Sequence, residues 1–292
     1  MDTVRIYEVA GHSFSLSLPD GVNSERILGA YKPFLISAAD DCGCLFAVRV
    51  EMGDLPEAGS TAGRFNDEAP YIWVFRGDDG AMNFGFSFTP EKPGAILMVR
   101  GNSATLHLPQ GIRYREADNY IGNSMMLMFA YHTAAHDTLM IHASVTVRDG
   151  RGYVFLGRSG TGKSTHSRLW LENIPGTWLL NDDNPVIRIV DGTVRVFGTP
   201  WSGKTPCYIN DNVPVGGIVR LEQAPHNEIR RLGTLEAYAA LAPSCSSMSW
   251  DRDWADAENR TLEKVISTVK CWHLKCLPDA DAALLSSGTC CL

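Results

Sequence analysis

The sequence predicts a mixed α/β (α+β) fold in which a β-rich N-terminal domain, residues 1–112, precedes an α/β domain, residues 113–292. Three observations support this prediction. Residues 1–112 contain short apolar segments separated by turn-forming residues, which is typical of strands in an antiparallel sheet. A strand-like segment, Tyr153–Leu156, then leads through a glycine-rich loop into a helix-like segment, His166–Asn173. A further strand-like segment, which starts at Trp178, ends in two adjacent carboxylates.

The composition restricts the classes of protein to consider. A chain of 292 residues with 45% hydrophobic and 20% charged residues is long enough to bury a sizeable core. Its formal net charge of −7 argues against nucleic acid as the main partner. No segment reaches the roughly 18 consecutive apolar residues of a membrane span, and the N-terminus lacks a signal-peptide pattern. We therefore expect a cytoplasmic protein with no membrane partner.

Turn sequences divide the N-terminal domain into short strands, and no catalytic cluster appears among them. The helix that follows is predicted over Asp118–His136, with Asp118 as its cap and an apolar face directed to the core. The expected strands are Val4–Val9, Ser13–Leu18, Leu45–Val50, Tyr71–Phe75, Ala81–Phe88, Ile96–Val99 and Thr105–Leu108.

A hairpin is predicted next, from a strand over Leu139–Val147 and its partner Tyr153–Leu156. His142 lies inside the first of these apolar strands. From the residues alone, a core histidine with a satisfied hydrogen bond is the favoured interpretation.

The loop after Leu156 matches G-x-x-x-x-G-K-[ST], in which backbone N–H groups surround phosphate oxygens, a lysine reaches the outer phosphates and a hydroxyl holds Mg²⁺. Glycines allow the backbone to approach an anion closely, and the N-terminus of the following helix attracts negative charge. The pattern predicts binding of ATP and Mg²⁺. The residues expected to contact the nucleotide are Gly157, Arg158, Ser159, Gly160, Thr161, Gly162, Lys163, Ser164 and Thr165.

A second match to the same pattern, Gly198–Thr205, is followed by two prolines and three Asn or Asp residues, which oppose a helix. Without a helix N-terminus this loop lacks half of the phosphate-binding mechanism. Two interpretations remain open: a second loop that offers Lys204 to a phosphate, and an ordinary surface loop.

Asp182 and Asp183 end the strand that follows the glycine-rich loop and its helix, where nucleotide-binding folds present a ligand for Mg²⁺. Two adjacent carboxylates can divide the work of phosphoryl transfer. One can hold the metal ion while the other accepts a proton from the attacking hydroxyl.

Three motifs in this order, Ile141-His142, Leu156–Thr165 and Leu179–Asp183, resemble the catalytic core shared by HPr kinase/phosphorylase and ATP-dependent phosphoenolpyruvate carboxykinase. The resemblance covers about residues 139–221 and implies a carboxykinase-like P-loop core. It also implies that His142 lies near the transferred phosphate, that Lys163 and Ser164 handle phosphates and Mg²⁺, and that the aspartates supply a base and a metal ligand. The resemblance favours Asp183 as the base, with Asp182 and Ser164 at the metal, and Lys204 in place of an arginine that stabilises the transition state.

The sequence therefore predicts an ATP-dependent kinase that phosphorylates a serine-like hydroxyl of a protein, peptide or small molecule. Two alternatives stay open: a non-catalytic ATP-binding regulatory module, and a carboxykinase-like enzyme, which the short chain disfavours. A homo-oligomer is compatible with the sequence. The C-terminal part is expected to add a strand over Pro214–Leu221 and helices over Thr234–Leu241, Trp254–Val269 and Asp279–Leu285.

Overall fold

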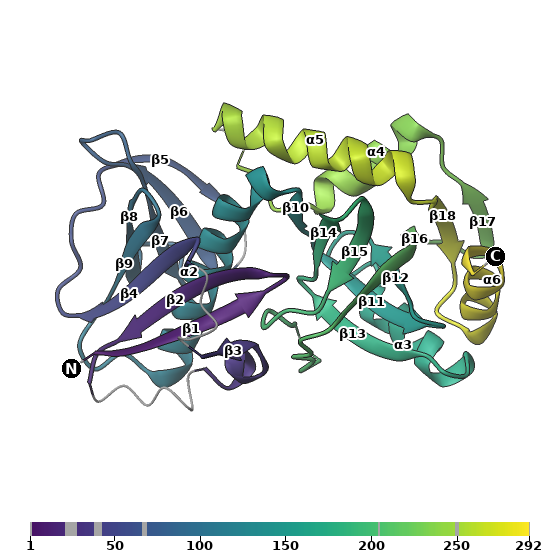
Figure 1. The fold of residues 1–292 in the computed structure, drawn as a ribbon, viewed down its shortest axis with the longest axis horizontal. Coiled ribbons are helices and arrows are strands. Elements are labelled where there is room, and N and C mark those ends of the chain that lie inside the picture. Colours follow the sequence, from purple (N-terminus) through teal and green to yellow (C-terminus); the bar gives the residue numbers. More distant parts are fainter. Residues whose placement is uncertain are drawn as a thin grey trace. The chain divides into compact units, whose positions relative to one another are not determined.

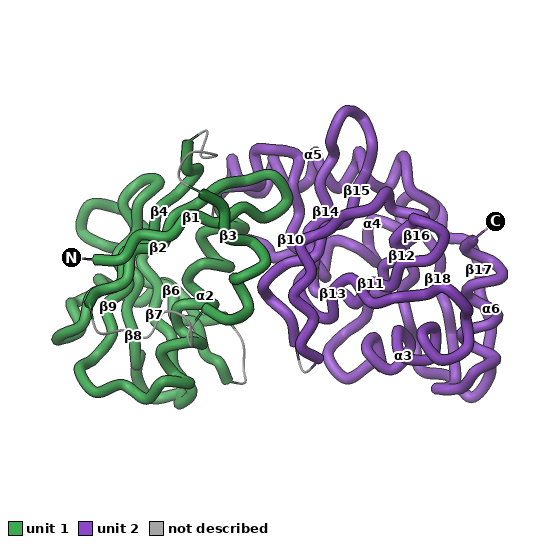
Figure 2. Tube along the Cα trace, turned by 60° about the horizontal axis from the view of Figure 1, so that its bottom comes forward, with its two compact units in different colours: residues 1–132 green, residues 133–292 purple. Residues whose placement is uncertain are grey.

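The computed structural model describes residues 2–20, 28–37, 43–65, 69–203, 205–248 and 251–291. The chain forms two compact units, Met1–His132 and Thr133–Leu292 (Figure 2). Both contain a large sheet with helices, so the prediction of a mixed α/β fold is confirmed.

The described residues of unit 1 form a nine-stranded sheet in the order β3-β1-β2-β4-β9-β8-β7-β6-β5 and one long helix, α2 (Figure 1). Most neighbouring strands are antiparallel, as predicted, but β4 is parallel to both β2 and β9. Two strands were not predicted: β3, which has only two residues, and β5, whose small and polar residues show no apolar alternation. The elements are β1 (Thr3–Val9), β2 (His12–Leu18), the 3₁₀ helix η1 (Gly29–Phe34), β3 (Leu35–Ile36), β4 (Phe46–Met52), β5 (Ser60–Phe65), β6 (Tyr71–Arg76), β7 (Met82–Ser87), β8 (Ala95–Arg100), β9 (Ser103–Leu108) and α2 (Tyr114–Thr133).

Helix α2 packs on this sheet through aromatic contacts. The ring of Phe129 lies 6.0 Å from that of Phe14, and the ring of His132 lies 5.6 Å from that of Phe46. The helix begins at Tyr114, four residues before the predicted start. These contacts attach α2 to unit 1, whereas the C-terminal domain was predicted to begin at residue 113.

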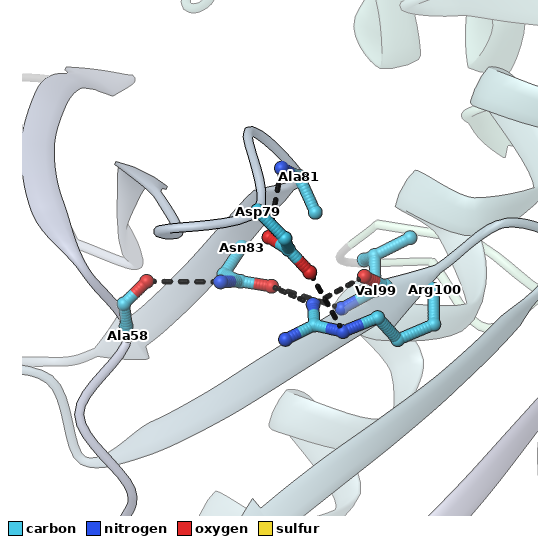
Figure 3. A network of polar contacts seen from close by, with 6 residues as sticks. All are labelled: Ala58, Asp79, Ala81, Asn83, Val99 and Arg100. Atoms are coloured by element: carbon cyan, nitrogen blue, oxygen red, sulfur yellow. Dashed lines mark hydrogen bonds and ion pairs between the residues drawn. The ribbon is translucent and has the colours of Figure 1, made fainter.

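A polar network ties the β6–β7 turn to β8 and to the segment before β5 (Figure 3). The fully buried Asn83 donates from Nδ2 to the carbonyl oxygen of Ala58 at 2.9 Å and accepts at Oδ1 from the N–H of Val99 at 3.0 Å. Arg100 also donates to Asn83 Oδ1, and its Nε lies 3.1 Å from Asp79 Oδ2. One buried amide thus satisfies backbone groups from two other segments, which fixes their relative positions.

In the part of unit 2 that the structure describes, a second nine-stranded sheet has the order β10-β14-β15-β16-β12-β11-β13, with β18 paired to β16 and β17 paired to β18. The predicted hairpin is present as β11–β12, and β14 and β15 form a second antiparallel hairpin. The elements are the 3₁₀ helix η2 (Ala134–His136), β10 (Thr138–Met140), β11 (Ala143–Arg148), β12 (Arg151–Leu156), α3 (Lys163–Asn173), β13 (Trp178–Asp183), β14 (Val186–Val190), β15 (Thr193–Phe197), β16 (Asn212–Gln223), β17 (Glu228–Arg231), α4 (Thr234–Leu241), the 3₁₀ helix η3 (Ala242–Ser244), α5 (Arg252–Thr268), β18 (Cys271–Cys276) and α6 (Ala280–Cys290).

Both faces of the central strand β12 are buried, because alternate residues of a strand point to opposite faces of the sheet. Tyr153 and Phe155 join a cluster with Trp170 of α3 and residues of α6. Val154 and Leu156 join the other cluster, to which α4 and α5 contribute. The helices therefore cover the sheet on both sides (Figure 1). None of the helices in the described ranges is long and apolar enough to span a membrane.

The strand predicted over Leu139–Val147 is interrupted at Ile141 and His142. Before the break, β10 pairs with β14; after it, β11 pairs with β12 and β13. The change of partners explains the interruption. His142 therefore does not lie inside a strand, and its side chain is 44% exposed, so the interpretation as a core histidine is wrong.

Candidate active site

The glycine-rich loop links β12 to α3, as predicted. Gly160 and Gly162 adopt φ angles of 79° and 109°, a left-handed conformation that favours glycine. Gly162 is also the N-cap of α3 and provides no side chain to satisfy the first N–H groups of the helix. The start of α3 can thus offer backbone N–H groups and the positive end of its dipole to an anion.

The side chain of Lys163 is hydrogen-bonded to the backbone of this loop. Its Nζ donates a hydrogen bond of 2.9 Å to the carbonyl oxygen of Gly157, and its side chain is nearly buried. Burial lowers the pKa of Lys163, and the negative charges of Asp183 and Asp182 oppose that shift. A phosphate bound in the loop would likewise favour the charged ammonium.

Strand register brings the three predicted motifs together. Ala143 of β11 is paired with Asp183 of β13 on one side and with Leu156 of β12 on the other. His142, which directly precedes Ala143, therefore lies between the end of the aspartate strand and the start of the glycine-rich loop. Its Nε2 is 3.3 Å from Asp183 Oδ1.

Asp183 is held in position at several points. Its second carboxylate oxygen, Oδ2, accepts a hydrogen bond of 3.0 Å from Asn184 Nδ2, and its backbone N–H donates to Asn181 Oδ1 at 3.1 Å. The carboxylate remains about one-third exposed. A carboxylate that is oriented and still accessible is suited to accept a proton from a bound hydroxyl.

The second glycine-containing loop contacts the same aspartates. The N–H of Gly203 donates to the carbonyl oxygen of Asp182 at 2.9 Å, and a Cβ at Gly203 would lie 3.0 Å from that oxygen. As predicted, no helix follows this loop in the described residues 205–211. Lys204, the predicted substitute for an arginine, lies outside the described residues.

Polar side chains that were not predicted from the sequence support the aspartate strand. Thr199 is fully buried, and its Oγ1 accepts from Asn181 Nδ2 at 3.1 Å and donates to the carbonyl oxygen of Asn184 at 2.7 Å. Ser144 of β11 and Ser167 of α3 share a hydrogen bond of 2.6 Å. Small polar residues in apolar strands, such as Ser144 and Asn181, are the signal that could have identified these contacts.

One cavity of about 450 Å³ unites most of the predicted residues. Three of the predicted nucleotide contacts are not among the lining residues. Gly157 accepts the hydrogen bond from Lys163, and Arg158 is exposed. Thr161 lines a neighbouring cavity. The lining residues are His142, Ala143, Ser159, Gly160, Gly162, Lys163, Ser164, Thr165, Asp182, Asp183 and Gly203.

The donor groups in this cavity match the chemistry of Mg²⁺. No group of three or more His, Cys, Asp or Glu side chains that could hold a metal ion occurs among the described residues. Mg²⁺ needs fewer protein ligands, because one or two carboxylates suffice when a nucleotide supplies phosphate oxygens. Asp182 is only 4% exposed and lines the cavity together with Ser164, whose side chain carries a hydroxyl.

Comparisons with known proteins found a matching family model and similar solved structures. The chain is similar to the solved structure of the HPr(Ser) kinase/phosphatase from Coxiella burnetii. The similar region covers 51% of this chain and 91% of that protein, with 13% sequence identity and a TM-score of 0.31. No curated protein matches the chain. The model of the family described as SynChlorMet cassette protein ScmC matches residues 119–269, slightly more than half of the sequence. The chain therefore belongs to the ScmC family.

Proposed function

We propose that this protein is an ATP-dependent phosphotransferase that moves the γ-phosphate to a hydroxyl group of a protein, peptide or small molecule, and that unit 2 is a carboxykinase-like P-loop core. One observation carries the proposal: the glycine-rich loop, Lys163, His142 and both aspartates line the same cavity. A phosphate-binding loop alone would fit any nucleotide-binding protein. An oriented carboxylate beside it supplies what a transferase needs in addition, a proton acceptor.

The charges in the cavity suit a triphosphate. The N–H groups at the start of α3 and the ammonium of Lys163 would neutralise the charge on phosphate oxygens, and both groups lie at the glycine-rich loop. Asp182 and the Ser164 hydroxyl would hold Mg²⁺, which, when bound, neutralises further charge on the phosphates. Lys204 directly follows Gly203 in the sequence, and the N–H of Gly203 donates to the carbonyl oxygen of Asp182. We propose that Lys204 adds a positive charge to the same cavity.

Asp183 would act as the base. It would accept the proton of the substrate hydroxyl while the hydroxyl oxygen forms a bond to the γ-phosphorus and the bond from that phosphorus to the bridging oxygen of ADP breaks. His142, 3.3 Å from Asp183 Oδ1, would orient the carboxylate and stay next to the transferred group. Positioning and charge neutralisation provide most of the rate enhancement in such reactions.

Transfer of label from ATP tests this function. Purified protein, Mg²⁺ and ATP labelled at the γ-phosphate are incubated with an extract of the source cells, with Asp183→Asn as the control for contaminating kinases. We expect at least one macromolecule or metabolite to carry label on a hydroxyl oxygen with the unmodified protein and not with Asp183→Asn. Equal labelling by both proteins, or no labelled acceptor in any fraction, would contradict the proposal.

A further inference from the structure

A second cavity of about 340 Å³ adjoins the candidate active site. The two cavities share Gly160, Gly162 and Thr165, so the glycine-rich loop forms a wall of each. The first cavity contains His142 and both aspartates, and the second contains none of them. A phosphate chain that lies on the loop with its terminal phosphate at the aspartates would therefore have its other end toward the second cavity.

The glycine-rich loop after β12, the start of α3 and the ends of β16 and β18 build this second cavity. β12 is parallel to β16, and β16 is parallel to β18, so the carboxyl ends of all three lie at the same edge of the sheet. Gln223 is paired with Cys276 at the ends of β16 and β18. Ligands of open α/β sheets bind outside the carboxyl ends of the strands, where this cavity lies. The lining residues are Gly160, Thr161, Gly162, Thr165, His166, Leu169, Leu221, Gln223, Ala224, Cys276, Leu277 and Pro278.

The side chains around the cavity are mostly apolar, and the polar groups among them are largely occupied. Gln223 Nε2 donates to the carbonyl oxygens of Gly160 and Thr161, both at 3.3 Å, which ties the end of β16 to the loop. His166 Nε2 lies 3.0 Å from the hydroxyl of Ser286, and burial lowers the pKa of His166 to about 4, so this imidazole is neutral near pH 7. An uncharged, largely apolar cavity is a poor site for phosphates and a good one for an aromatic ring.

We propose that this second cavity holds the base and ribose of the nucleotide whose triphosphate lies in the active site. The proposal rests on the proposed function and adds to it the part of the molecule that binds the nucleoside: the ends of β16 and β18 together with Leu169 of α3. The volume of the second cavity lies at the lower end of the range of about 300–1,000 Å³ that is typical of ligand pockets. The base is held mainly by contact with Leu169, Leu277 and Pro278.

Filling the cavity tests the proposal. Ala224 is half-buried and lines the cavity, whereas Ala239 of α4 is exposed and lies outside it, so Ala224→Phe and Ala239→Phe form a matched pair. Calorimetry would measure binding of Mg²⁺-ATP and of Mg²⁺-tripolyphosphate, which has the phosphates without the nucleoside. We expect Ala224→Phe to weaken ATP binding by about tenfold or more and to change tripolyphosphate binding by less than about twofold. Ala239→Phe is expected to change neither.

Retained tripolyphosphate binding also shows that the variant is folded around the loop. If Ala224→Phe does not fold, Leu277→Ala, which removes a side chain that is 38% exposed, is expected to weaken ATP binding by about fivefold and to spare tripolyphosphate. Unchanged ATP binding in the folded variants, or equal affinity of the unmodified protein for ATP and tripolyphosphate, would overturn this inference and leave the proposed function intact. Absence of binding of either compound to the unmodified protein would overturn both.

Discussion

Replacing Lys163 by alanine is expected to lower the turnover of ATP by about 10²–10³, the effect typical of removing one charged donor from a preorganised site. The ammonium donates a hydrogen bond to the carbonyl oxygen of Gly157, and Lys163 as a residue is only 9% exposed, so water cannot fully replace its charge at the phosphates. Steady-state release of ADP would measure the effect.

Lys264→Ala is the matched control for this change. Lys264 is an exposed lysine of α5 in the same unit and pairs with Asp137 away from the cavity lining. Exposed ion pairs contribute about 0–1 kcal/mol to stability, so turnover is expected to stay within about twofold. Turnover of Lys163→Ala within about threefold of that of the unmodified protein would show that this lysine does not handle the phosphates.

Asp183→Asn is expected to spare ATP binding and to lower phosphoryl transfer by about 10²–10⁴, the usual contribution of a positioned base. The amide has nearly the same size and keeps an oxygen that can accept from Asn184, but it cannot take a proton from a hydroxyl. Calorimetry would measure ATP binding, and release of label from γ-labelled ATP to the acceptor would measure transfer.

Asp182→Asn distinguishes the two carboxylates. We expect this variant to need a higher Mg²⁺ concentration for half-maximal transfer and to recover activity as Mg²⁺ is raised, whereas Asp183→Asn stays inactive at any concentration. Full transfer by Asp183→Asn with normal ATP affinity would show that the base is assigned to the wrong residue.

The elements of this fold that depend on short segments could be predicted from the sequence. The strand, glycine-rich loop and helix around Lys163 lie within a short segment, and periodicity and glycine placement predict such segments well. The antiparallel hairpin β11–β12 was predicted for the same reason. Edge strand β5 was missed, because its residues lack the apolar alternation that marks a strand.

Features that depend on distant pairing could not be predicted. The break at His142 arises because β10 and β11 pair with different strands, and an apolar run looks the same whether or not its partners change. The boundary after α2 follows from aromatic contacts with strands about 80 to 115 residues earlier, such as that between Phe129 and Phe14. The second cavity requires that the end of β18 reach the loop after β12, more than 100 residues earlier, and no local pattern encodes that contact.

We expect the loop, the imidazole and the two carboxylates to surround one nucleotide. A crystal structure of the protein with Mg²⁺ and a non-hydrolysable ATP analogue would show whether they do. We expect the γ-phosphate between Lys163 and Asp183, with His142 beside it and the base among Leu169, Ala224 and Leu277. A triphosphate bound elsewhere, with Asp183 directed away from the γ-phosphate, would contradict this expectation.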